Sequence, residues 1–168
     1  MAPARFAPLR LLTNPHIAPP QTALLSTAEL SEPAFHPPRT TLRILHPLLP
    51  FWPVDLALPP TASPLPISLG DVLISLHHAL HTRIAHVDWD ELSSEDAERV
   101  TQAFTRRCRA EAMQSGVPAA HLRDREVEER NGGVRRVDFL AGLGGGTVFR
   151  GLVREEEDPD GCVRVNFA

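Results

Sequence analysis

Two histidines one helical turn apart, His77 and His81, are the side chains whose types and spacing first suggest chemistry. Imidazoles four residues apart lie on one face of a helix, where they can bind zinc or another transition metal, and Asp88 and Asp90 follow nearby. The zinc-protease pattern needs a glutamate after the first histidine, and His78 occupies that place. A structural role at the margin of an apolar helix face is the commoner use of histidine. A metal site at His77 and His81 is therefore the alternative hypothesis, and a structural role is the favoured one.

Other motifs for catalysis or cofactor binding are incomplete. Cys108 stands among arginines that would activate a thiol, but it shares a helix face with Val100 and Phe104, which predicts a small buried side chain. The glycine-rich run 142–146 lacks the third glycine of the dinucleotide fingerprint, and the chain contains no lysine for a P-loop. We predict a hairpin loop there. No catalytic residue and no cofactor is expected, and the interpretation leans against an enzyme.

The arginines are the candidate interaction residues, because the chain has no lysine. Exposed arginines that could contact a partner are expected on the second helix and in the charged segment 118–131: Arg106, Arg109, Arg123, Arg125 and Arg130. Arg107 projects toward the apolar helix face, so we expect it to pair with a carboxylate such as Asp138. The formal net charge of −4 argues against nucleic-acid binding.

Composition describes one globular domain. The chain has 168 residues, of which 42% are hydrophobic and 23% charged. Its two cysteines suit a reducing compartment, and no stretch of about 18 apolar residues could span a membrane. We therefore expect a cytoplasmic protein without a membrane partner.

Proline divides the chain into an extended front and a helical remainder. Residues 1–20, with prolines at 3, 8, 15, 19 and 20, are predicted to form an extended arm, and residues 21–168 a single domain. Alternating apolar residues predict strands at 41–44 and 52–58. Helical spacing predicts one helix that begins after Ser68 and a second that begins at Ser93 or Ser94.

The segment 118–131 is predicted to be a frayed helix or a long loop, and three closing strands are predicted at 137–141, 147–153 and 163–167. Short connections favour antiparallel neighbours. The expected fold class is α+β, with an antiparallel sheet, two main helices packed on one of its faces, and the proline-rich N-terminal arm.

Several segments resemble a domain of unknown function that is widespread in mushroom-forming basidiomycete fungi. The most specific is 133–140, GVRRVDFL, which is followed by FRGL at 149–152; weaker matches include Gly70–Leu73 and Trp89. The resemblance implies a fungal source and a single domain, and it carries no activity with it.

Function is therefore expected to rest on contacts with proteins. The favoured hypothesis is a non-catalytic protein-interaction or dimerisation module, in which a protein partner or a second copy binds the arm, the charged segment or a free sheet edge. The alternative is a small metal-dependent enzyme or metal binder centred on His77 and His81.

Overall fold

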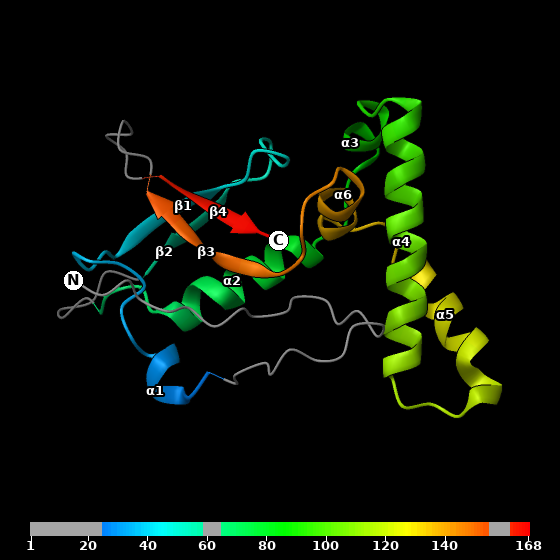
Figure 1. Cartoon of the computed structure of the whole chain (residues 1–168), viewed down its shortest axis with the longest axis horizontal. Coiled ribbons are helices and arrows are strands. Elements are labelled where there is room, and N and C mark those ends of the chain that lie inside the picture. The colour runs from blue at the N-terminus through cyan, green and yellow to red at the C-terminus, as the bar shows by residue number, and fades with distance from the viewer. Residues whose placement is uncertain (1–24, 59–64, 155–161) are drawn as a thin grey trace.

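Two β-hairpins lie side by side in one sheet (Figure 1). The computed structural model describes residues 25–58, 65–154 and 162–168. The first hairpin joins β1 (Thr41–Leu45) to β2 (Val54–Ala57), and the second joins β3 (Phe149–Arg154) to β4 (Val163–Phe167). Within the described residues these strands make a four-stranded sheet of order β2-β1-β4-β3.

The sheet is mixed, so the prediction of a purely antiparallel sheet is wrong. Both hairpins are antiparallel, but β1 pairs with β4 in parallel, with Ile44 beside Val163. The helices lie between these strands in the sequence, so no short turn fixes their relative direction. The C-terminal strand β4 is therefore internal, and the edges are β2 and β3.

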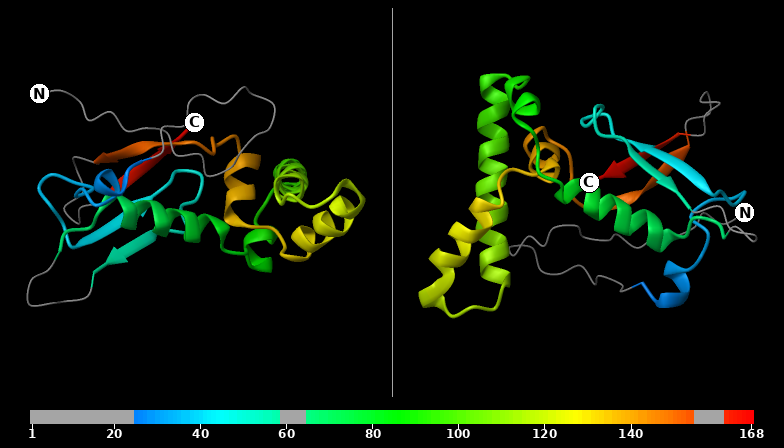
Figure 2. Two further views of the ribbon diagram at one scale, coloured as in Figure 1. Left: turned by 90° about the horizontal axis from the view of Figure 1, so that it is seen from below. Right: turned by 180° about the vertical axis from the view of Figure 1, so that it is seen from behind.

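Helix α2 (Leu69–His81) covers one face of the sheet, as Figure 2 shows. It begins with the predicted capping box, in which the Ser68 hydroxyl accepts from the Asp71 N–H and the Asp71 carboxylate accepts from the Ser68 N–H. Its apolar stripe packs on the inward-facing residues of the strands to form the first core. That core contains Leu42, Ile44, Leu56, Val72, Leu76, Val163 and Val165.

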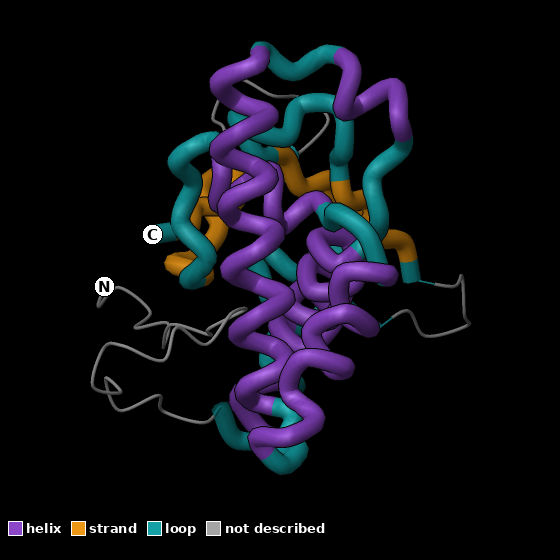
Figure 3. Tube along the Cα trace, turned by 90° about the vertical axis from the view of Figure 1, so that its right-hand side faces the viewer, coloured by secondary structure: helices purple, strands orange, loops and turns teal. Residues whose placement is uncertain are grey.

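The helices that follow α2 form a second half beyond one end of the sheet, and Figure 3 shows the molecule from that end. Helix α4 (Ser94–Gln114), which has Ser93 as its N-cap, packs against α5 (Leu122–Asn131) and α6 (Arg136–Gly142). The short helix α3 (His86–Asp90) connects α2 to α4. The prediction placed both long helices on the sheet, but α4 packs on helices instead. A second core there includes Leu80, Val100, Val137 and Leu140.

Helix α6 is the main error of the sequence prediction, which placed a strand at 137–141. Four successive residues, 137–140, are buried, so neither a helical nor an alternating apolar pattern is visible. As a result, the glycine run connects a helix to β3 and is not a hairpin loop. Gly142 allows the close approach of α6 to α4, since a Cβ there would lie 2.7 Å from the Val100 Cα.

Two further segments were predicted loosely or not at all. The charged segment 118–131 folds as a 3₁₀ turn, Ala119–His121, followed by α5. Helix α1 (Thr27–Leu30) has a capping box between Ser26 and Glu29. The predicted arm, residues 1–20, lies outside the described residues. Within the described ranges, no helix is long and apolar enough to cross a bilayer.

Candidate functional site

A hollow of about 500 Å³ opens beside α3 and is the candidate functional site. We call it the Trp89 pocket, and its described lining residues are Arg83, Ile84, Ala85, His86, Trp89 and Val134. Its volume falls within the range of small-ligand and side-chain pockets, and most of its wall is apolar.

Backbone pairing between two connecting segments builds the wall. The Ile84 N–H donates to the Val134 carbonyl at 3.1 Å, and the Arg136 N–H donates to the Thr82 carbonyl at 3.1 Å. These bonds join the segment after α2 to the segment before α6. Asp88 then starts α3, because its carboxylate accepts from the Ala85 N–H at 2.8 Å. The pocket is therefore held by backbone bonds on both sides.

Phe139 of α6 fixes the position of Trp89. Its ring meets Trp89 edge-on with centroids 6.2 Å apart, and it meets Trp52 in the same way at 5.2 Å. The Arg136 guanidinium lies over Trp52, 5.2 Å from the ring centroid. Both tryptophans of the chain thus rest on one buried phenylalanine.

The predicted pair of Arg107 and Asp138 is confirmed. The Arg107 Nε and Nη2 atoms donate to the two carboxylate oxygens of Asp138 at 2.8 and 3.0 Å, and both residues are buried. Arg107 also donates to the Gly133 carbonyl at 3.1 Å, and the Arg135 N–H donates to Asp138 at 2.9 Å. This pair therefore ties α4 to α6 directly beneath the pocket.

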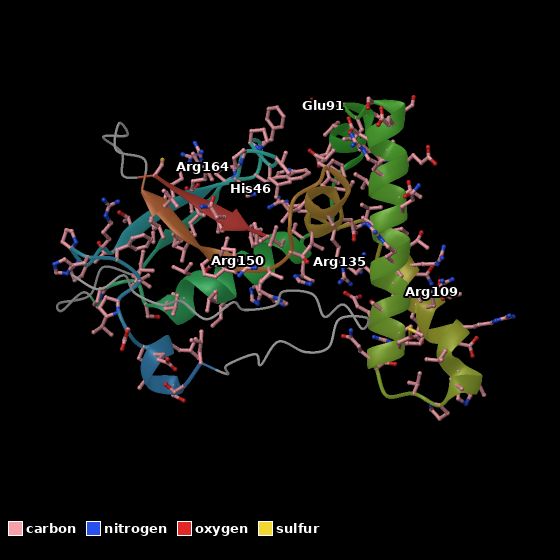
Figure 4. The ribbon with its side chains drawn as sticks, viewed as in Figure 1. His46, Glu91, Arg109, Arg135, Arg150 and Arg164 are labelled. Atoms are coloured by element: carbon pink, nitrogen blue, oxygen red, sulfur yellow. The ribbon has the colours of Figure 1, made fainter. Side chains whose placement is uncertain are left out.

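A second set of charges joins α5 to this centre. Arg135 reaches Glu111 of α4 at 3.2 Å and Glu129 of α5 at 3.6 Å, and Figure 4 shows it between α6 and α4. Arg125 pairs with Glu129. Burial raises the pKa of Glu111, whereas its hydrogen bond with Glu129 lowers the pKa of Glu129. The pKa values of the two carboxyl groups are therefore shifted in opposite directions.

Gly133 holds Arg83 at the rim of the pocket. It has a φ of +77°, which favours glycine, and a Cβ there would lie 2.6 Å from the Arg83 Nε. The guanidinium therefore lies across a position that any side chain would fill. Among the described residues, Arg83 has no hydrogen-bond or ion-pair partner for this guanidinium.

The residues of the segment 133–140, which carries the family resemblance, make structural contacts in the helical half. Gly133 and Val134 accept backbone or guanidinium hydrogen bonds, Asp138 holds Arg107, and Phe139 carries both tryptophans. Val137 and Leu140 are fully buried.

The predicted metal ligands are close together. The ring centroids of His77 and His81 lie 4.1 Å apart, with an angle of 32° between the ring planes. The His81 Nδ1 is 2.8 Å from the His77 carbonyl oxygen. Burial lowers the pKa of His81. Across the described ranges no cluster of three or more histidine, cysteine or acidic residues forms a metal-binding group, so Asp88 and Asp90 do not complete a site with these rings.

The predicted interaction arginines divide into two groups. Arg125 and Arg130 pair with glutamates of their own helix. Arg106, Arg109 and Arg123 are exposed, and none of them has an ion pair with another described residue. Arg109 lies on α4 beside α5 in Figure 4.

The predicted burial of Cys108 is confirmed, and burial raises the pKa of its thiol. This thiol is therefore a packing residue, although Arg107 acts in the opposite direction. Sequence reasoning missed the Trp89 pocket. The available signal was a tryptophan next to Asp88, in the short segment between the two long predicted helices.

Comparison with known proteins gives one match. The model of the Family of unknown function (DUF6699) matches residues 11–161. Neither the curated proteins nor the solved structures provide a match. Because the family match covers most of the sequence, the chain belongs to the Family of unknown function (DUF6699).

Proposed function

We propose that this protein is a non-catalytic protein-interaction module that binds an apolar, acidic segment of a partner protein in the Trp89 pocket. The single observation that supports this proposal is the pocket itself: a hollow of about 500 Å³ with a mostly apolar wall and, at its rim, a guanidinium that has no partner among the described residues. That volume accommodates one or two large apolar side chains.

The charges around the pocket favour an acidic partner. Arg83 and His86 are its described polar lining residues, and both side chains can donate hydrogen bonds to an anionic group. A segment that presents a carboxylate next to an apolar side chain complements this arrangement.

Both edges of the sheet are less suited to association. Strand β2 is four residues long and follows Pro53, which has no N–H to donate. Strand β3 contains a register shift between Phe149 and Gly151, and such a bulge disfavours pairing with another strand. A partner that docks side chains into the pocket is therefore favoured over dimerisation through strand pairing.

Selection of peptides from a random displayed library tests the proposal. The bait is the full chain, and the matched bait is Ala85→Phe, which fills the pocket from an exposed position of its wall. Val87→Phe, a bulky change at a 68% exposed side chain outside the pocket lining, is the control. We expect peptides that bind the chain and the control but not Ala85→Phe. Equal recovery on all three baits would overturn the proposal.

The finer expectations from the sequence remain proposals. The fungal source rests on the resemblance of GVRRVDFL and FRGL, and the cytoplasmic location rests on cysteine content. The metal-binding alternative at His77 and His81 requires a third ligand from outside the described residues.

A further inference from the structure

We infer that Arg83 is the specificity-determining residue of the Trp89 pocket and that it selects partner segments in which a carboxylate adjoins the apolar side chain. This inference rests on the proposed function, because it assigns the chemistry of the segment that the pocket accepts.

The first support is that the Arg83 guanidinium lies over Gly133 and has no counterion among the described residues. Its Nε, Cζ and Nη2 atoms would lie 2.6, 3.0 and 3.2 Å from a Cβ at Gly133, so the planar group lies flat over that glycine. Its five N–H groups then form a fork that matches the two oxygens of a carboxylate.

The second support is the rigid base beneath Gly133. The Gly133 carbonyl accepts from Arg107 Nη2 at 3.1 Å, and Arg107 is held on both carboxylate oxygens of buried Asp138. The backbone on which Arg83 lies is therefore fixed from the core outward. The neighbouring Val134 carbonyl is bonded to the Ile84 N–H, next to Arg83 itself. Both the base and the root of the Arg83 side chain are positioned by backbone bonds.

The third support is the local balance of charge. Asp138 and Glu111 bind Arg107, and Asp88 caps α3, so these three carboxylates are already engaged, whereas Asp90 and Glu91 follow Trp89 and are exposed. The other ionisable group of the pocket lining is His86, which adds no negative charge. A bound carboxylate would thus meet the fork of Arg83 beside the apolar surface of Trp89 and Ile84.

The test compares two small probes that differ only in this group. N-acetylphenylalanine carries the carboxylate, and N-acetylphenylalaninamide carries a neutral amide of the same shape. The chain has two tryptophans and no tyrosine, so Trp52→Phe leaves Trp89 as the sole strong fluorophore. Trp89 emission then reports occupation of the pocket during titration. We expect the carboxylate probe to bind about tenfold more tightly than the amide, as one charge-assisted pair would provide.

Variants of the full chain, made with Trp52→Phe, separate specificity from folding. Arg83→Met keeps the apolar stem and should bring the two dissociation constants together, while thermal unfolding stays unchanged. Arg83→Lys keeps the charge but not the planar fork, and should give an intermediate ratio. His86→Gln is the matched control at the same rim and should retain the full ratio.

The outcomes distinguish this inference from the proposed function. If both probes bind equally, or if Arg83→Met retains the preference, the inference about Arg83 is overturned and the pocket remains a binding site. If neither probe changes Trp89 emission and no displayed peptide prefers the unfilled pocket, the proposed function fails together with it.

Discussion

Arg107 and Asp138 meet inside the helical half of the protein through two hydrogen bonds of 2.8 and 3.0 Å, although 31 positions separate them in the chain. Their side chains are 2% and 1% exposed, so neither charge has access to bulk water. Arg107 extends the contact to Gly133 and Glu111. The pair therefore links α4 to α6 and, through the Gly133 carbonyl, to the residue that precedes Val134 in the wall of the Trp89 pocket.

Asp138→Asn should strongly destabilise the protein. The amide keeps the shape of the side chain but removes the buried counterion of Arg107 and leaves only its pair with the partly exposed Glu111, which lowers the free energy of unfolding by about 3–5 kcal/mol. Urea unfolding followed by circular dichroism measures this loss. The matched control is Asp55→Asn, whose ion pair with Arg43 is 52% and 62% exposed; it should change stability by less than about 1 kcal/mol. Equal losses in the two variants would show that the buried pair has no special role.

Phe139→Ala should destabilise the second core and change the emission of both tryptophans. Removal of a buried phenylalanine lowers the free energy of unfolding by about 3–5 kcal/mol. Because Trp52 and Trp89 both contact this ring, their fluorescence should shift to longer wavelength in the folded state. Phe139→Leu retains most of the apolar volume and keeps the measurement accessible if the alanine variant unfolds. Phe51→Ala, at a 75% exposed ring, is the control and should leave both properties unchanged.

The stability of the protein should fall on mild acidification because of His46 and His81. Burial lowers the pKa of both histidines below the ordinary value of 6.5, and Arg164, beside His46 in Figure 4, lowers that of His46 further. Each depressed pKa contributes stability that is present above pH 6.5 and is lost as the pH falls through the folded-state pKa. Unfolding midpoints measured between pH 8 and pH 5 should decrease toward acid, and His46→Gln with His81→Gln should flatten this slope. An undiminished slope in the double variant would assign it to carboxylates instead.

Features that depend on residues close together in the sequence were predicted correctly. Ser68 and Ser93 cap α2 and α4 as predicted, since the capping residues lie three positions from their partners. The pairing of Arg107 with Asp138 was also predictable, because an arginine on an apolar helix face requires a buried carboxylate.

Longer-range features were not accessible in this way. The parallel pairing of β1 with β4 joins segments separated by all the longer helices, and no local pattern encodes it. Five of the seven residues of α6 are buried, which obscures the period that identifies a helix. The Trp89 pocket depends on that helix, since Phe139 and Val134 lie on or just before it. The error about α6 therefore also concealed the candidate site.

Arg135→Gln should release α5 without unfolding the rest of the protein. Arg135, the N-cap residue of α6, pairs with both Glu111 of α4 and Glu129 of α5, and α5 has no buried residue of its own. Loss of these contacts should lower the local opening free energy of α5 by about 1–2 kcal/mol, because the pairs are partly shielded from water. Hydrogen exchange of the α5 amides should therefore accelerate about tenfold, while exchange in α2 stays the same. Arg130→Gln is the matched control, since Arg130 pairs only within α5 with Glu126 among the described residues, and it should change α5 exchange by less than about threefold. Equal acceleration in the two variants would mean that pairing within the helix, and not the link to α6, holds α5 in place.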